Sequence, residues 1–570
     1  MQGREHRKPR TRGRTRIAIA LAIATAGAVA AIALVPGSLA DTRIEGTVVD
    51  EFGPIEGATV RVQASEHAVT TSSDGHFSLA VAASDEELTV TAWYPEYFVG
   101  WTTATPGGGP VTITIRRHYT TDNPDYDWFS MEGADGSASC GLCMPIHYEE
   151  WLADAHSQSA VNPRFLTMYH GTDIDGNQSP LTRYAYSRDY GSFPIPPNLD
   201  EPYYGPGYKL DFPEMEGNCG SCHIPAAAAY PGMAYAVDPA NLQGIESEGI
   251  FCEFCHKIGG VILDPETQLP YPNMPGVLSI ELYRSEGEEV LFFGTFDDVT
   301  RRVTRLPLEE ESAFCAPCHY GVFWDVVIYD SYGEWLRSPY SDPETGQTCQ
   351  DCHMPVTDDT WFALPEKGGH IREAGRIFSH TMPGASDVTL LQEAVTMGVS
   401  AYTEDGRLEI SVSITNDKTG HHVPTDSPLR QMILLVEAED SEGSSLLLFD
   451  GPILPDWCGV GDPTLGYYAG LPGVAYAKVL EELWTGISPS GSYWNPTRIV
   501  SDNRIAAYST ATSQYTFVMP ESGDVEVSVK LLYRRAYKAL MDQKKWGVPD
   551  ILMEECQVVV ESTENAVAGD

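Results

Sequence analysis

The sequence predicts a multidomain protein in which a loop-rich core with short helices lies between an N-terminal and a C-terminal β-sandwich. Residues 42–117 and 398–565 alternate apolar and polar side chains with the period of two that is typical of half-buried strands. Residues 125–384 are instead rich in Pro, Gly and Tyr and show little periodicity. The length of 570 residues allows about three domains of ordinary size.

Residues 1–40 have the pattern of an export signal. A stretch rich in Arg is followed by an apolar run from Ile17 to Val35 and by a small-x-small cleavage pattern that ends at Ala40. The run is also just long enough to serve as an uncleaved N-terminal membrane anchor. Both alternatives predict an exported protein, placed in the periplasm, on the cell surface or outside the cell.

Residues 42–117 are expected to form the first sandwich, with strands at 44–49, 58–62, 88–92 and 111–115 and turns at Gly-Pro, Asp-Gly and Gly-rich positions. The runs Gly46-Thr-Val-Val-Asp50, Pro54-Ile-Glu-Gly-Ala58 and Thr71-Ser-Ser-Asp-Gly-His-Phe77 resemble the carboxypeptidase regulatory-like domain, a transthyretin-type sandwich. That resemblance implies an accessory module for adhesion or spacing, without catalysis.

The central segment repeats the pentapeptide Cys-x-x-Cys-His four times, which is the attachment signature of c-type haem. In this chemistry two thiols bond covalently to the porphyrin, and the adjacent His is the proximal ligand of its iron. His is only 15 of the 570 residues, so four such followers would arise by chance about once in two million sequences. The predicted thioether cysteines are Cys219, Cys222, Cys252, Cys255, Cys315, Cys318, Cys349 and Cys352, and the predicted proximal ligands are His223, His256, His319 and His353.

Structural zinc is the alternative for these cysteines, because two pairs of thiols can make a four-thiolate site. Zinc does not require a His after each second Cys, and export places the chain where c-type haem is assembled. We therefore favour haem. A macrocycle would also replace much of an apolar core, which agrees with the loop-rich sequence and with short helices expected at 148–159 and 390–396.

Each of the four irons would need a second axial ligand. Multihaem electron carriers usually use a second His, which keeps the iron low-spin and gives a lower potential than Met ligation. The favoured distal ligands are His156, His380 and His421; His370 and His170 compete for the fourth position.

Several runs resemble the exported multihaem c-type cytochromes, which include the tetrahaem cytochrome domain of nitrifying bacteria and respiratory cytochromes with a β-sandwich tail. The resemblance covers roughly residues 130–430. It rests on Trp151-Leu-Ala-Asp-Ala-His156, the runs around the second and fourth motifs, and Gly420-His-His-Val-Pro-Thr425. It implies that the Trp-x4-His and Gly-His-x-x-Pro-Thr histidines are distal ligands, which supports His156 and His421.

A fifth pair, Cys140 and Cys143, is followed by Met144 where the related motif would carry His. Three interpretations remain. The pair could hold a fifth haem with Met144, His147 or no protein group at the proximal position, it could form a local disulfide, or it could be a relic with free thiols. In the C-terminal sandwich, Cys458 and Cys556 are the candidates for a disulfide, with free thiols as the alternative.

The chain has 36 Lys+Arg against 80 Asp+Glu, a formal charge of −44. This balance argues against nucleic acid and anionic membrane surfaces as partners and permits basic redox partner proteins. Contact with a membrane is expected only through the possible N-terminal anchor.

The favoured function is that of an electron carrier with four, possibly five, covalently bound haems. One alternative is an oxidoreductase of small nitrogen or sulfur compounds with an open haem at Cys140–Cys143. Another is a subunit of a conducting extracellular assembly, either a homo-oligomer or a filament. No catalytic residue is predicted, and an electron-transfer role is favoured over an enzymatic one.

Overall fold

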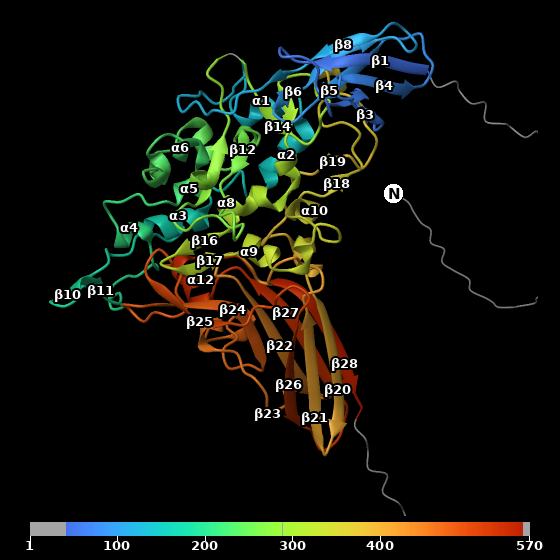
Figure 1. Ribbon diagram of the computed structural model, residues 1–570. Helices are drawn as coiled ribbons and strands as arrows, with labels where there is room; N and C mark the ends of the chain where they lie inside the picture. Colours follow the sequence, from blue (N-terminus) through green and yellow to red (C-terminus); the bar gives the residue numbers. More distant parts are fainter. Residues whose placement is uncertain (1–41, 288, 562–570) are drawn as a thin grey trace, which may run out of the picture.

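The computed structural model describes residues 42–561 except residue 288, and the predicted export signal lies outside these residues. Three parts follow one another along an elongated molecule (Figure 1). An N-terminal β domain lies at one end, a core of loops and short helices occupies the middle, and long C-terminal strands form the other end.

The N-terminal part is a β-sandwich-like domain of two sheets with strand orders β4-β1-β8 and β3-β2-β5-β7. Its apolar residues alternate as the sequence predicts, so that Val48, Val60, Val90 and Ile113 are fully buried between the sheets. The strands are β1 (Thr42–Val49), β2 (Thr59–Val62), β3 (Ala68–Thr70), β4 (His76–Val81), β5 (Leu88–Trp93), β6 (Tyr97–Phe98), β7 (Gly100–Ala104), β8 (Val111–Thr114) and β9 (Arg116–Arg117).

The middle part contains only short helices and two-stranded sheets. Its helices are α1 (Ser137–Gly141), α2 (Pro145–Ala153), α3 (Pro163–His170), α4 (Tyr208–Asp211), α5 (Gly220–His223), α6 (Pro225–Ala228), α7 (Cys252–Cys255), α8 (Ala316–His319), α9 (Ser331–Leu336), α10 (Cys349–His353) and α11 (Val388–Gln392). Its strands are β10 (Tyr184–Ser187), β11 (Gly191–Pro194), β12 (Ile258–Val261), β13 (Ile280–Leu282), β14 (Phe292–Gly294), β15 (Val303–Arg305), β16 (Gly321–Phe323), β17 (Val326–Tyr329), β18 (Val356–Thr357) and β19 (Ile377–Phe378).

The helix expected at 148–159 differs from the structure. Helix α2 starts earlier, at Pro145, and ends at Ala153, because Asp154 takes an extended backbone conformation with ψ of 158°. Asp154 then accepts a hydrogen bond from the backbone N–H of His156 (2.8 Å), which starts a turn in place of further helix. His156 is therefore presented by a turn.

The C-terminal part has a four-stranded sheet, β20-β21-β26-β23, and a five-stranded sheet, β25-β24-β22-β27-β28. Buried residues of both sheets share one hydrophobic core, for example Ile410 and Phe517 from the first and Leu434 and Val527 from the second. The elements are β20 (Thr396–Glu404), β21 (Arg407–Thr415), β22 (Gln431–Asp440), β23 (Leu448–Asp450), β24 (Gly473–Glu482), β25 (Thr497–Asp502), β26 (Thr510–Val518), β27 (Val525–Arg534), α12 (Lys538–Lys544) and β28 (Ile551–Val560).

The predicted Cys458–Cys556 disulfide is absent from the structure, in which both residues are free thiols. Cys458 is buried beside Gln431 at the start of β22, and its carbonyl accepts a hydrogen bond from Arg534. Cys556 pairs in register with Val529, five residues before Arg534 on β27. Five residues of strand span about 17 Å, which a disulfide cannot bridge.

Polar contacts tie the middle part to both β parts. Trp93 of β5 donates a hydrogen bond to Thr304 (2.9 Å) on the N-terminal side. On the C-terminal side the Lys544 ammonium donates to the carbonyl oxygens of Thr167 and Thr172 (3.0 Å each) and of Pro206 (2.6 Å). These hydrogen bonds attach the Cys-rich core to the β parts on both sides of it.

Across residues 42–561, with residue 288 left aside, the structure contains no helix of sufficient length and apolar character to cross a membrane.

Candidate cofactor-binding core

Each of the four pentapeptides forms a single helical turn, α5, α7, α8 and α10, in the middle of the molecule. In a helical turn, residues three and four apart lie on the same face. The first Cys, the second Cys and the His have these spacings, so the fold can direct both thiols and the imidazole toward one porphyrin.

The proximal imidazoles are held by hydrogen bonds at Nδ1. His223 contacts the Ser159 carbonyl (3.1 Å), His256 the Phe293 carbonyl (2.8 Å) and His353 the Pro383 carbonyl (2.7 Å). An Nδ1–H bound to a backbone carbonyl fixes the tautomer whose Nε2 carries the lone pair for a metal. These contacts leave Nε2 as the atom available to the iron.

His319 is held differently, because its Nδ1 lies 3.8 Å from the Asp426 carboxylate. Burial opposes the charged form of this imidazole, but Asp426 outweighs burial and raises the pKa of His319 to about 9. In the same way the Glu309 carboxylate, 3.3 Å from Nδ1 of His256, outweighs the effect of burial and raises the pKa of His256 to about 9. A carboxylate behind a ligating His increases the basicity of that ligand.

Three of the proximal histidines face a second imidazole across a gap. The ring centroids are 6.2 Å apart for His319 and His156, 6.4 Å for His256 and His380, and 6.3 Å for His353 and His421. Two imidazoles that bind one metal from opposite sides, each with a metal–nitrogen bond of about 2 Å, have centroids roughly 6 Å apart. The three gaps therefore have the width that an iron atom between two imidazoles requires.

Each of the three facing histidines is also fixed at Nδ1. His156 contacts Asp154 (2.7 Å), His380 the Phe378 carbonyl (3.2 Å) and His421 the His422 carbonyl (2.9 Å). Burial lowers the pKa of His380 to about 3 and also lowers the pKa of His421. Both imidazoles are therefore neutral at physiological pH, which is the form that binds a metal.

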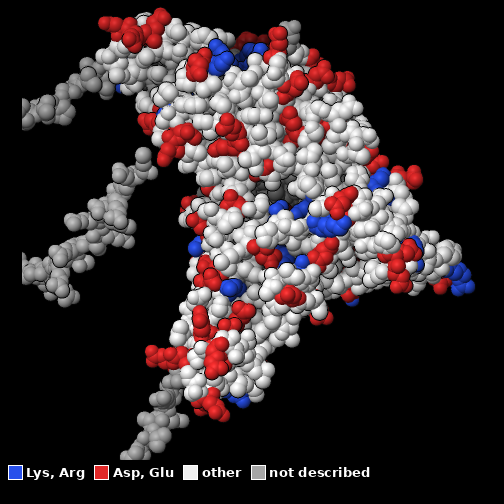
Figure 2. Space-filling model, turned by 180° about the vertical axis from the view of Figure 1, so that it is seen from behind, with Lys and Arg blue, Asp and Glu red and all other residues white. Residues whose placement is uncertain are grey.

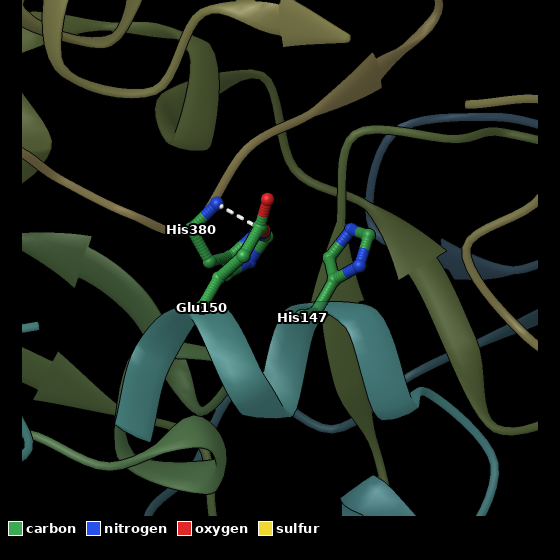
Figure 3. Close-up of side chains that lie close together, drawn as sticks. All are labelled: His147, Glu150 and His380. Carbon is green, nitrogen blue, oxygen red and sulfur yellow. Dashed lines mark hydrogen bonds between the residues drawn. The ribbon is translucent and has the colours of Figure 1, made fainter. Parts of the chain in front are cut away.

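Figure 3 shows how helix α2 supports His380. Glu150 accepts hydrogen bonds from the backbone N–H of His380 (2.8 Å) and from the Ser379 hydroxyl (3.1 Å). The ring of His147, also on α2, lies 4.5 Å from that of His380. One ligand atom from each of His147, Glu150 and His380 lies within 4.8 Å of the others, so the trio could bind a metal ion. Since His380 also faces His256, we interpret Glu150 as the anchor of the His380 loop.

The remaining distal candidates do not face a proximal histidine in the described part of the chain. His370 is exposed. His170 ends helix α3, where its ring lies 5.1 Å from the Tyr169 ring. The ring that contacts His223 is that of Phe165, which stacks on it at 4.1 Å with an interplanar angle of 5°.

Thiols of different motifs contact each other. Cys222 lies beside Cys318, Cys315 beside Cys349 and Cys140 beside Cys252. The α8 motif therefore adjoins both the α5 and the α10 motif, and Cys255 of the α7 motif interacts electrostatically with Cys318. This arrangement gives a branched order, with α7, α5 and α10 all next to α8.

At the fifth pair, Cys140 and Cys143 are free thiols and form no disulfide in the structure. Met144 (φ −123°, ψ 62°) precedes a proline with nearly the same backbone angles as Ile224 (−137°, 57°) and Met354 (−133°, 55°). The latter two directly follow His223 and His353. Met144 therefore corresponds to the residue after the histidine, and the proximal position itself is missing from this motif.

Three guanidinium groups, Arg164, Arg430 and Arg535, lie close together where the middle part meets the C-terminal strands. Burial and the charges of the other two lower the pKa of Arg164 to about 10, and burial and the charge of Arg430 lower the pKa of Arg535. One carboxylate, Asp426, lies 3.8 Å from Arg430, and Nη2 of Arg164 is buried without a hydrogen-bond partner in the described residues. An enclosed positive cluster of this kind fits the propionates of a haem, which would supply the missing anions.

Several supporting residues were not predicted from the sequence, namely Glu150, Glu309, Asp426, the three arginines and Glu334, whose carboxylate accepts a hydrogen bond from the His422 backbone (3.1 Å). Each carboxylate is distant in sequence from the histidine it contacts, and no spacing pattern links them. Burial of a charged residue is the signal that identifies them, and burial becomes visible only in the structure.

Comparisons with known proteins find a similar solved structure and a family that matches one domain. The structure is similar to the crystal structure of a penta-haem cytochrome c552 from Thermochromatium tepidum, with 18% identity, a TM-score of 0.49, and coverage of 74% of this chain and 98% of that chain. No curated protein matches the sequence. The carboxypeptidase regulatory-like domain family matches residues 43–116, in agreement with the sequence analysis. Residues 43–116 of this chain are therefore a carboxypeptidase regulatory-like domain.

Proposed function

We propose that this protein is an exported multihaem c-type cytochrome that carries electrons through four covalently bound haems. The observation that carries the proposal is the set of three imidazole pairs at 6.2–6.4 Å, each built on one of the four Cys-x-x-Cys-His turns. Structural zinc would not explain a second imidazole at this distance, because a four-thiolate site has no place for it.

Bound haem would supply a one-electron couple at each motif. The protein holds both axial imidazoles by hydrogen bonds at Nδ1, so that little has to move when the charge of the iron changes. The contacts between thiols of different motifs favour close approach of neighbouring macrocycles around α8. Such an arrangement suits transfer of single electrons along a branched path.

The acidic composition, −44 in total, suits a basic redox partner protein. Figure 2 shows acidic side chains distributed widely over one face of the molecule, with fewer basic ones. Electrostatic attraction to such a partner should weaken as ionic strength rises, because surface charges are screened over about 10 Å at 0.1 M salt.

The test is a potentiometric titration of the full chain, produced by a host that can mature c-type cytochromes. We expect reversible one-electron steps at low potential and rapid oxidation by a basic redox protein that slows with added salt. A matured protein that exchanges no electrons with such partners, but turns over small nitrogen or sulfur oxyanions, would be an enzyme and would contradict the proposal.

A further inference from the structure

We propose that the sixth coordination position above His223 is left free by the protein and takes a small exogenous ligand with a donor lone pair. This inference rests on the proposed function, because it requires a haem at Cys219 and Cys222. It assigns the open site to a complete motif, whereas the sequence analysis considered only the incomplete Cys140–Cys143 motif for this role.

The first argument is the difference between His223 and the other proximal histidines. His256, His319 and His353 each face an imidazole at 6.2–6.4 Å, but no imidazole ring contacts His223 anywhere in residues 42–561 outside the undescribed position 288. The other histidines of the middle part and its border lie elsewhere. His147 packs on His380, His422 contacts Glu334 (3.3 Å), and His370 is exposed at the surface.

The second argument is that His223 itself is fixed as a proximal ligand. Its Nδ1 contacts the Ser159 carbonyl, and Ser159 returns a hydrogen bond from its hydroxyl to the His223 carbonyl (2.9 Å). Phe165 stacks on the imidazole face and prevents the ring from turning. His223 is therefore held in place as an axial ligand, as are the three proximal histidines that have an imidazole partner.

The third argument concerns the polar side chains around this motif. Tyr329 and Tyr493 have ring centroids 5.4 Å apart at 79°, and both phenols lie within electrostatic range of Cys219. Phe323 packs against both rings at 6.0 and 5.6 Å. The two phenols also interact with each other, so only one of them has a proton to spare for a ligand. We assign Tyr493 as the donor that would stabilise a ligand on this iron.

His170 is the one remaining imidazole that could move to this position. It lies at the C-terminal end of α3, five residues after Phe165, and its neighbours are Tyr169, Asp238, Lys209 and Glu216. A variant of His170 therefore tests whether the position above His223 is free or whether His170 binds the iron there.

The experiment uses the full matured chain and two probes, carbon monoxide for the reduced form and azide for the oxidised form. We expect one high-spin haem by electron paramagnetic resonance and one carbon monoxide bound per polypeptide. His170→Ala should leave both unchanged. Tyr493→Phe should weaken azide binding by up to about tenfold, the effect of one lost hydrogen bond, without changing the haem content.

The double variant Cys140→Ser/Cys143→Ser is the matched control, because it removes the other possible open site. Retained carbon monoxide binding supports the assignment to His223, and its loss would place the open position at the fifth pair and overturn the proposal. A fully low-spin protein without carbon monoxide binding would overturn it as well, as would a high-spin signal that appears only in His170→Ala. A protein without any haem would instead refute the proposed function.

Discussion

At the residue scale, function depends on imidazoles that stay neutral and point in a fixed direction. Burial keeps the pKa of His353 at about 4 and that of His380 at about 3, well below the ordinary value near 6.5. Their Nδ1 atoms contact backbone carbonyls, which leaves Nε2 for the metal. At these two positions low basicity and a fixed tautomer would keep the iron coordinated over a wide pH range, whereas Asp426 and Glu309 make His319 and His256 more basic ligands.

His380→Ala should convert one low-spin haem into a high-spin haem, because the described structure offers no replacement ligand of the same geometry except His147 beside it. Electron paramagnetic resonance and the number of carbon monoxide molecules bound measure the change, which should be one additional open site per chain. His370→Ala, at an exposed position, is the control and should change neither. An unchanged spectrum in His380→Ala would show that His147 or another group is the ligand to the His256 iron.

Arg430→Gln should lower the reduction potential of one haem by tens of millivolts, because removal of a partly buried positive charge stabilises the oxidised form. A spectroelectrochemical titration measures the shift. Arg498→Gln is the control, since Arg498 is 63% exposed and pairs with Glu481 at the surface. Equal potentials in the Arg430 variant and the parent would show that the arginine cluster does not neutralise propionates.

At the element scale, the buried carboxylate of Glu334 joins helix α9 to the loop that carries His421. Glu334 accepts hydrogen bonds from the His422 backbone (3.1 Å) and the Arg504 guanidinium (2.6 Å), and its side chain is fully buried. Burial alone would raise the pKa of Glu334, but His422 and Arg504 outweigh it and hold this pKa well below its usual range. Glu334 therefore fixes the position of His421 from a different element.

Glu334→Gln should destabilise the fold by about 1–3 kcal/mol, because it weakens the charge-assisted hydrogen bond from Arg504, which keeps Asp502 as an anionic partner (2.8 Å). The lowered pKa also fixes the direction of the pH dependence. The contribution of Glu334 is complete above its unfolded-state pKa of about 4.3 and declines as the pH falls toward the folded-state value. Urea unfolding at pH 7 and pH 4 should therefore show a smaller difference between variant and parent at pH 4. A constant difference would mean that the charge of Glu334 is not responsible.

The sequence predicts much of this architecture, and its failures have physical causes. Period-two alternation identified β1, β2, β5 and β8 of the N-terminal domain, and it is clearest in β1, which is buried on one side only. The strands β3, β4 and β7 were not predicted. The end of α2 at Ala153 was not predicted, because the turn depends on the Asp154 side chain and not on helix propensity. The pairing of His380 with His256 could not be derived from spacing, since 124 positions separate them and contact requires the whole core to fold.

At the scale of the whole molecule, two β parts lie at the ends of a loop-rich core whose apolar packing is divided among small clusters, such as that of Trp151, Phe251 and Phe254. Lys544 of α12 bonds to three carbonyl groups of the middle part, and burial lowers its pKa to about 7. Figure 2 shows basic side chains beside a hollow in the middle of the molecule, whereas acidic ones predominate elsewhere on this face. A core divided in this way suits cofactors that would add apolar surface to its packing.

Lys544→Met should change how stability depends on pH. The folded-state pKa of about 7 lies below the unfolded-state value near 10.4, so the unfolded chain binds more protons between these values. The stability of the parent should therefore rise with pH from 7 to 10, and that of the variant should rise less. Denaturant titrations at pH 7 and pH 9.5 measure both slopes. If stability rises equally with pH in the parent and the variant, the Lys544 ammonium does not lose its proton in this pH range.

The most direct test of the central claim is the intact mass of the denatured, matured polypeptide, combined with its pyridine haemochrome spectrum. The four Cys-x-x-Cys-His turns predict four covalently attached haems per chain, and replacement of both cysteines in one turn should remove one of them. A colourless polypeptide whose mass equals that of the processed chain, or one that releases zinc on denaturation, would contradict the account.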